Sequence, residues 1–148
     1  MTTIAYRDGI LAADTVEIAE GYRVGTCEKI KKRKKDGVLV GAGGRASYCE
    51  AFMDWVLDGE EDDPPAIEKG DDGHPDSGGI IIRLDGSVEL WGENGSTPIV
   101  AEYVATGTGA ALCLGAFAFG ATAEEAVRAA IKHDIHSGGE VTVLRLGK

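Results

Sequence analysis

Short apolar runs separated by glycine-containing turns make up much of this chain. Residues 3–6 and 10–13 are two such runs, joined by Arg7-Asp8-Gly9. An Asp-Gly turn between strand-like runs is the strongest short-range signal of a β-hairpin. Further strands are predicted at 29–33 with 38–42, at 80–84 with 88–91, shortly after Pro98, and at 141–146. The pattern therefore predicts several antiparallel hairpins.

Three other segments have the spacing of helices. In residues 45–57, apolar side chains recur at the offsets of one buried helix face. These side chains are Tyr48, Phe52, Trp55 and Val56. A second, apolar helix is predicted at 110–119, directly after Thr106-Gly107-Thr108-Gly109. A third begins at Thr122, which forms a capping-box sequence with Glu125, and runs to about residue 134.

The order of these elements favours an α+β fold, with two antiparallel sheet layers and helices packed outside them. Residues 58–79 are rich in Asp, Glu, Pro and Gly, so we expect an acidic surface loop there. A loop of this length is either functional or disordered. No repeat or linker divides the chain, so residues 1–148 are predicted to form one domain.

Charge and cysteine content narrow the classes of function. The formal net charge of −10 argues against nucleic acid as a partner, because phosphate binding needs a basic face. Cys27, Cys49 and Cys113 have neither disulfide-framework nor zinc-site spacing, which favours a reduced, cytoplasmic setting. No apolar stretch approaches the roughly 18 residues of a membrane span. The first residues lack the pattern of a signal peptide.

The candidate chemistry lies at the amino terminus. The chain has no GxSxG, HExxH or P-loop sequence. Thr2 follows the initiator methionine, and a small second residue permits removal of that methionine. A free α-amine with a pKa of about 7.7–8.0 can act as a base near neutral pH, so a terminal threonine would hold both nucleophile and base. Many ordinary proteins begin Met-Thr, and this feature alone does not favour catalysis.

Five motifs in order resemble proteasome β subunits and HslV, which are N-terminal nucleophile hydrolases. The motifs are Thr2-Thr3-Ile4 leading to Ala12-Ala13-Asp14, Glu28-Lys29-Ile30, Ala42-Gly43-Gly44-Arg45-Ala46, Thr106-Gly107-Thr108-Gly109, and Asp134-Ile135-His136-Ser137-Gly138-Gly139. The resemblance implies a four-layer αββα sandwich of two antiparallel sheets flanked by helices. The helical region after the first helix is shortened, because an acidic loop stands where the family has a second long helix.

The same resemblance implies roles for single residues. Thr2 Oγ would attack the scissile carbonyl, with its α-amine as the base. The Lys29 ammonium would ease deprotonation of Thr2, and Asp14 would hold Lys29 in place. The backbone N–H of Gly43 would face the developing oxyanion, although Gly41 is a competitor for this role. Each residue also has a plain structural interpretation, as a turn residue or part of a solvated basic strip.

Further residues are carried over from the last motifs. Thr108, Asp134 and Ser137 would form hydrogen bonds around the Thr2 amine. The backbone carbonyls of Ile131, Asp134 and Ser137 would bind a structural Na⁺ or Mg²⁺ ion. The chemistry itself is expected to require no cofactor.

The function that the resemblance implies is a threonine-type endopeptidase acting on peptides or unfolded proteins. It would work in a self-compartmentalising homo-oligomer, with an ATP-dependent unfoldase ring as partner. Two alternatives stay open, a non-catalytic proteasome-like ring or scaffold subunit and a small-molecule amidase of the same fold. The catalytic prediction depends on removal of Met1, since otherwise the α-amine is not on Thr2.

Overall fold

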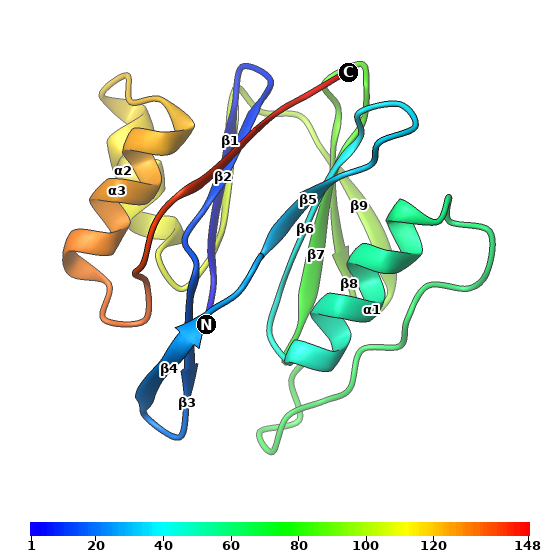
Figure 1. Ribbon diagram of the computed structural model, residues 1–148, viewed down its shortest axis with the longest axis horizontal. Helices are drawn as coiled ribbons and strands as arrows, with labels where there is room; N and C mark the ends of the chain where they lie inside the picture. The colour runs from blue at the N-terminus through cyan, green and yellow to red at the C-terminus, as the bar shows by residue number, and fades with distance from the viewer. The chain divides into compact units, whose positions relative to one another are not determined.

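The computed structural model describes residues 1–148 and divides into two compact units. One unit contains Met1–Ile30 and Ala101–Arg145, and the other contains Lys31–Val100 and Leu146–Lys148. Three α-helices and antiparallel sheets form the elements of the two units (Figure 1). The α+β class predicted from the sequence is therefore confirmed. None of the three helices has the length and apolar character needed to cross a membrane.

A four-stranded antiparallel sheet, in the order β10-β1-β2-β11, forms the centre of the first unit. Its strands are β1 (Thr3–Arg7), β2 (Ile10–Ala13), β10 (Tyr103–Gly107) and β11 (Thr142–Arg145). In the turn between β1 and β2, Asp8 and Gly9 have φ values of 52° and 78°. A type I′ hairpin turn requires this left-handed conformation at both central residues. The Asp-Gly signal thus predicted this hairpin correctly.

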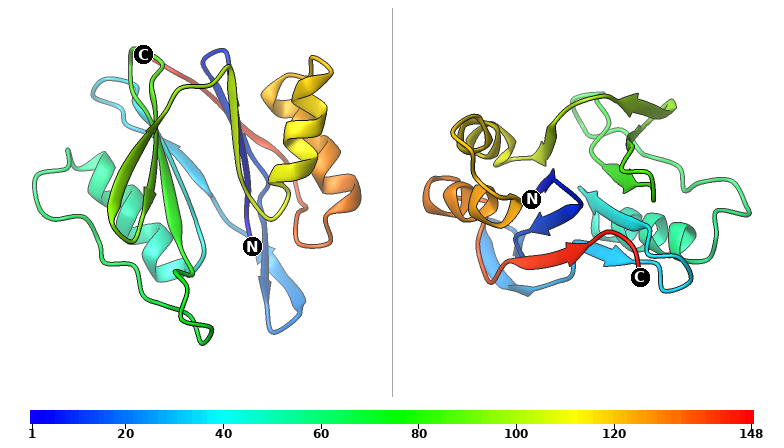
Figure 2. Two further views of the ribbon diagram at one scale, coloured as in Figure 1. Left: turned by 180° about the vertical axis from the view of Figure 1, so that it is seen from behind. Right: turned by 90° about the horizontal axis from the view of Figure 1, so that it is seen from above.

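Helices α2 (Ala110–Ala118) and α3 (Ala123–His133) cover one face of the same sheet (Figures 1 and 2). Their buried side chains pack against Ala5 and Ala12, which point toward the helices from β1 and β2. Alanine at these two positions leaves room for the helices to approach the sheet backbone closely. This packing fixes the start of β1 and the end of β2 beside the C-terminal end of α3, where the last sequence motif begins.

The predicted capping box is present at the start of α3. Thr122 Oγ accepts from the Glu125 N–H at 3.2 Å, while the Glu125 carboxylate accepts from the Thr122 N–H at 3.0 Å. Two of the otherwise unpaired N–H groups at this helix end are satisfied in this way. The helix begins at Ala123, as the sequence predicted, and ends at His133.

The second unit is built on a five-stranded sheet with the order β5-β6-β7-β8-β9. Its strands are β5 (Ile30–Lys32), β6 (Leu39–Gly43), β7 (Gly78–Ile82), β8 (Val88–Gly92) and β9 (Gly95–Ile99). Helix α1 (Ala46–Leu57) packs on this sheet through the buried Phe52. The ring of Phe52 needs a glycine opposite it, because a Cβ at Gly79 would lie 2.2 Å from Phe52 Cε1.

The acidic segment between α1 and β7 contains no helix and, apart from an isolated bridge between Lys69 and Pro75, no strand. It is nevertheless tied to the rest of the second unit by charged groups near both of its ends. Glu60 accepts from Arg33 and Arg83, and Arg45 pairs with Glu68 and Asp76. These contacts give the segment a defined path along α1 and the sheet.

Three strands were not predicted from the sequence. The hairpin of β3 (Val16–Ala19) and β4 (Tyr22–Thr26) forms a separate two-stranded sheet in the first unit. All five residues of β4 are exposed, so its pattern lacks the buried alternation that identifies a strand. Strand β9 contains Pro98, which is tolerated because β9 lies at the edge of its sheet.

Candidate active site

The buried polar and charged residues of the chain are Thr2, Thr3, Asp14, Lys29 and Ser137. All five belong to the first unit. Burial of polar groups lowers stability unless they are hydrogen-bonded, and burial of charges requires pairing. No buried side-chain nitrogen or oxygen lacks a hydrogen-bond partner. The first unit therefore contains a satisfied polar cluster, which includes four of the seven catalytic residues predicted from the sequence.

Asp14 and Lys29 form an ion pair inside the unit. Asp14 follows β2 and Lys29 precedes β5, and their side chains are 0% and 3% exposed. Lys29 Nζ lies 3.1 Å from each carboxylate oxygen of Asp14. The backbone N–H groups of Thr3 and Gly138 also donate to this carboxylate, at 2.9 Å and 3.1 Å. Both Asp14 oxygens thus have donors, as a buried charge requires.

The backbone on each side of Thr2 is fixed by this cluster. Lys29 Nζ donates to the Met1 carbonyl oxygen at 2.8 Å, and that carbonyl carbon is bonded to the Thr2 nitrogen. The Thr2 carbonyl accepts from the Thr108 N–H at 2.9 Å. Gly107, with φ of 97°, permits this approach, because a Cβ there would lie 1.7 Å from the Thr2 oxygen. The nitrogen of Thr2 is therefore held beside a buried ammonium group.

A second set of hydroxyls surrounds Asp134, at the C-terminal end of α3. Its Oδ2 accepts from Thr108 Oγ1 at 2.7 Å and also from Ser137 Oγ. Partial burial raises the pKa of Asp134, but the hydrogen bonds from Ser137 and Thr108 outweigh it and lower the pKa below its ordinary value. Ser137 Oγ also lies 2.6 Å from Thr3 Oγ1. The structure thus brings Thr108, Asp134 and Ser137 together, next to the residue that follows Thr2.

The roles predicted for these residues remain predictions, and so do two others. Gly43 is the last residue of β6 in the second unit, paired there with Gly78. The proposed cation ligands Ile131, Asp134 and Ser137 lie at the end of α3 and in the turn after it. Within that turn, the Asp134 carbonyl accepts from the Ser137 N–H at 3.1 Å. No group of three or more His, Cys, Asp or Glu side chains is arranged to hold a metal ion.

The sequence motifs assign no role to Thr3, Gly109 or Gly138. Thr3 is fully buried, and its Oγ1 accepts from the Gly109 N–H at 3.0 Å. A polar residue at an inward-facing strand position was the available signal, since successive side chains of a strand point to opposite faces. Gly109 and Gly138 lie in two of the sequence motifs, but they act through backbone N–H groups, whose acceptors a sequence pattern does not specify.

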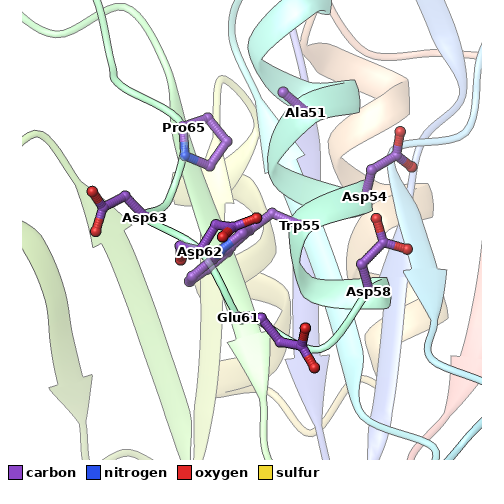
Figure 3. Close-up of a pocket in the computed structure, with 8 residues that line it drawn as sticks. All are labelled: Ala51, Asp54, Trp55, Asp58, Glu61, Asp62, Asp63 and Pro65. Carbon is purple, nitrogen blue, oxygen red and sulfur yellow. Dashed lines mark hydrogen bonds between the residues drawn. The ribbon is translucent and has the colours of Figure 1, made fainter.

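A shallow pocket of different character lies in the second unit (Figure 3). It is lined by Ala51, Asp54, Trp55, Asp58, Glu61, Asp62, Asp63 and Pro65, from α1 and the acidic segment. Figure 3 shows Asp54 and Asp58 on the helix side, with Asp63 on the opposite side of Trp55. The pocket contains no hydroxyl or thiol nucleophile. The buried cluster around Thr2 and Thr3 is therefore the stronger candidate for an active site.

Comparison with solved structures identifies a similar fold. The chain is similar to BPH of Thiobacillus denitrificans, whose structure was determined in complex with epoxomicin. The two share 18% sequence identity and a TM-score of 0.66, over 99% of each chain. No protein-family model and no curated protein matches the chain. At this identity the similarity establishes a shared fold, and the residues themselves must support any function.

Proposed function

We propose that this protein is a threonine-type endopeptidase whose nucleophile is Thr2, exposed by removal of Met1. The observation that carries the proposal is the buried Lys29–Asp14 pair, whose ammonium group donates to the peptide carbonyl directly before Thr2. Removal of Met1 would leave a primary amine at the Thr2 nitrogen. It would also free the Lys29 donor that Met1 now occupies.

The reaction would proceed by acyl transfer. Thr2 Oγ1 attacks the carbonyl carbon of the substrate and its proton passes to the Thr2 amine, directly or through a water molecule. The Lys29 ammonium favours the negative charge that develops on Thr2 Oγ1. The amine then returns the proton to the departing amine of the substrate, leaving an ester on Thr2. Water hydrolyses this ester by the same proton transfers in reverse.

Other predicted residues fit supporting roles in this scheme. The Gly43 N–H is proposed to stabilise the oxyanion of the tetrahedral intermediate, where one donor is worth about a hundredfold or more in rate. Asp134, Ser137 and Thr108 are proposed to bind the Thr2 amine and keep it oriented. The complete fold is proposed to be the four-layer αββα sandwich, with a Na⁺ or Mg²⁺ ion held by carbonyls of Ile131, Asp134 and Ser137.

The similarity to BPH supports the proposal through the compound in its structure. That protein's structure was determined in complex with epoxomicin, a proteasome inhibitor. The proposed substrates are peptides or unfolded proteins, with an ATP-dependent unfoldase ring as the partner that would deliver them.

Intact-mass and activity measurements on the natively expressed protein test the proposal. We expect a mass without Met1, hydrolysis of fluorogenic peptides, and inhibition by epoxomicin. Thr2→Ala should abolish hydrolysis, and Thr2→Ser should retain part of it, because a serine keeps both hydroxyl and amine. A protein that quantitatively retains Met1, or a Thr2→Ala variant with full activity, would rule the proposal out.

The Met1 contact also favours a second candidate, a non-catalytic subunit of a proteasome-like assembly. With Met1 retained, its carbonyl satisfies Lys29 and no free amine exists at Thr2. The same mass measurement separates the two candidates. Retained Met1 together with unchanged assembly of Thr2→Ala would support the non-catalytic role.

A further inference from the structure

Hydrogen-bond directions in the hydroxyl network follow from the number of protons available. The ionised Asp134 carboxylate can only accept, so Ser137 must donate its single hydroxyl proton to Asp134 Oδ2. Ser137 Oγ then has no proton left for Thr3, and Thr3 Oγ1 must donate to Ser137 across the 2.6 Å that separates them. One lone pair of Thr3 Oγ1 is taken by the Gly109 N–H. The chain of donors therefore runs from Gly109 through Thr3 and Ser137 to Asp134.

Thr3 is the link between the two halves of the buried cluster. Its backbone N–H donates to Asp14 Oδ1 at 2.9 Å, and its carbonyl accepts from the Asp14 N–H at 3.1 Å. Its side chain lies on the helix-facing side of β1, where it contacts Ser137 and Gly109. A single residue thus connects the Asp14–Lys29 pair with the Asp134–Ser137 pair.

We propose that Thr3 is a positioning residue whose hydroxyl, by donating to Ser137, holds the Ser137 hydroxyl on the Asp134 carboxylate. Its effect on catalysis rests on the proposed function of Thr2, which immediately precedes it. Hydrogen bonds in a chain polarise one another, so a donor to Ser137 strengthens the bond from Ser137 to Asp134. Without Thr3, Ser137 is free to rotate away from the carboxylate.

The substitution Thr3→Val tests this role because valine has nearly the shape of threonine and leaves the backbone contacts to Asp14 in place. The direct readout is the loss of stability caused by Ser137→Ala, measured by urea unfolding in the wild type and in Thr3→Val. We expect this loss to be smaller in Thr3→Val, since the hydrogen bond from Thr3 to Ser137 is already absent there. Thr3→Ser keeps the hydroxyl, so Ser137→Ala should cost as much in that variant as in the wild type.

Thr15→Val is the matched control. Thr15 Oγ1 donates to the Glu140 carbonyl at 2.7 Å and is not part of the Asp134 network. The same loss of a hydroxyl there should leave the stability cost of Ser137→Ala unchanged. If Thr3→Val does not fold, Thr3→Ala removes the same hydroxyl without a branched side chain, and the same smaller cost of Ser137→Ala is expected. A cost of Ser137→Ala that is unchanged in the folded Val or Ala variant overturns the proposal.

Peptidase kinetics separate this inference from the proposed function. In an active protein, Thr3→Val should lower kcat by about tenfold to a hundredfold with KM within about twofold, the order expected when a catalytic group is misplaced. If the wild type has no peptidase activity, the proposed function fails, while the unfolding measurements still decide whether Thr3 positions Ser137.

Discussion

At the scale of single residues, Asp14 is the acidic residue among the buried polar and charged residues of the molecule. Its carboxylate is fully buried and accepts from an ammonium group and two backbone N–H groups. The two backbone donors, of Thr3 and Gly138, lie 135 positions apart in the sequence. One carboxylate thus joins the beginning of β1 to the turn after α3.

Asp14→Asn is predicted to destabilise the protein strongly. The asparagine amide nitrogen would face donors instead of accepting from them, and the buried Lys29 would lose its counter-charge. We expect a loss of about 3–5 kcal/mol in the free energy of unfolding, as found when one partner of a buried pair is removed. Chemical denaturation of the two proteins measures the difference.

Asp8→Asn provides the control for this prediction. The Asp8 side chain is 83% exposed and lies 3.6 Å from Arg7, so its ion pair is a surface contact. Such pairs contribute about 0–1 kcal/mol. Equal effects of the two substitutions would contradict the importance that we assign to burial of Asp14.

Some residues of the buried polar cluster were assigned candidate roles from the sequence, and others were not. Asp14, Lys29 and the Asp134–Ser137 segment were found because they lie in motifs of characteristic spacing. Thr3 was passed over as a motif residue without a role, because its importance comes from burial against Ser137 and Gly109, more than 100 positions away. Contacts of this kind depend on how strands pair, which spacing along the chain does not encode.

At the scale of elements, two short-range sequence patterns correctly predicted the structure at a helix start and at a hairpin turn. The capping box at Thr122 and the Asp-Gly turn at Asp8 each satisfy backbone groups within a few residues, and both formed as predicted. The β3–β4 hairpin was missed because it turns through Glu20 and Gly21, both with positive φ, and has little apolar alternation. Its strands are specified by pairing with each other more than by burial.

At the start of the acidic segment after α1, the Glu60 carboxylate lies between two arginines of the same unit. Glu60 accepts from Arg33 at 3.0 Å and from Arg83 at 2.7 Å and 2.8 Å. Hydrogen bonding from Arg83 lowers the pKa of Glu60 below its ordinary value of 4.5, burial partly opposes this, and Arg33 adds to the lowering. The ionised form of Glu60 is therefore favoured in the folded protein.

Glu60→Gln is predicted to lower the stability of the protein in a pH-dependent way. A carboxyl whose pKa is lower in the folded state stabilises that state above its unfolded pKa, and this stabilisation is lost as the pH falls through the folded pKa. We expect the variant to be less stable by about 1.5–3 kcal/mol at pH 7, as for hydrogen bonds to a charged group. The difference should shrink below pH 4.5. Thermal or urea unfolding at several pH values measures it.

Glu61→Gln is the neighbouring control, because Glu61 is exposed on the rim of the acidic pocket. Its unfolding curve should follow that of the wild type at each pH. A Glu60→Gln variant with the same constant offset at pH 3 and pH 7 would contradict the linkage argument.

At the scale of the whole molecule, charge and apolar surface are unevenly distributed. The chain has a net charge of −10, yet the stretch 110–121 contains no charged residue. Three large apolar side chains of this stretch are exposed, Leu112, Leu114 and Phe119, the last to 94%. Two copies of an acidic protein repel each other over most faces, and an uncharged apolar helix face avoids that repulsion. We therefore propose that the protein forms a homo-oligomer and that α2 is part of its interface.

Leu114→Glu is predicted to break up that oligomer. A carboxylate on α2 would lose its hydration in the interface. Native mass spectrometry should find the wild type above, and the variant at, the 15.5 kDa of a single chain. Leu84→Glu, at an exposed leucine of the second unit, should leave the oligomer intact. A monomeric wild type would contradict the proposed compartment.

The first unit is assembled from two stretches of chain, Met1–Ile30 and Ala101–Arg145, and this division has a consequence during synthesis. Strand β1 pairs with β10, about 100 residues later, which a ribosome working at roughly 5–20 residues per second reaches after about 5–20 s. For that interval Met1 lies at the end of a strand that is paired only with β2, and Gly138 is not yet available to Asp14. An aminopeptidase would therefore meet Met1 on an open chain, and the nucleophile proposed for Thr2 would be uncovered before the site closes around it.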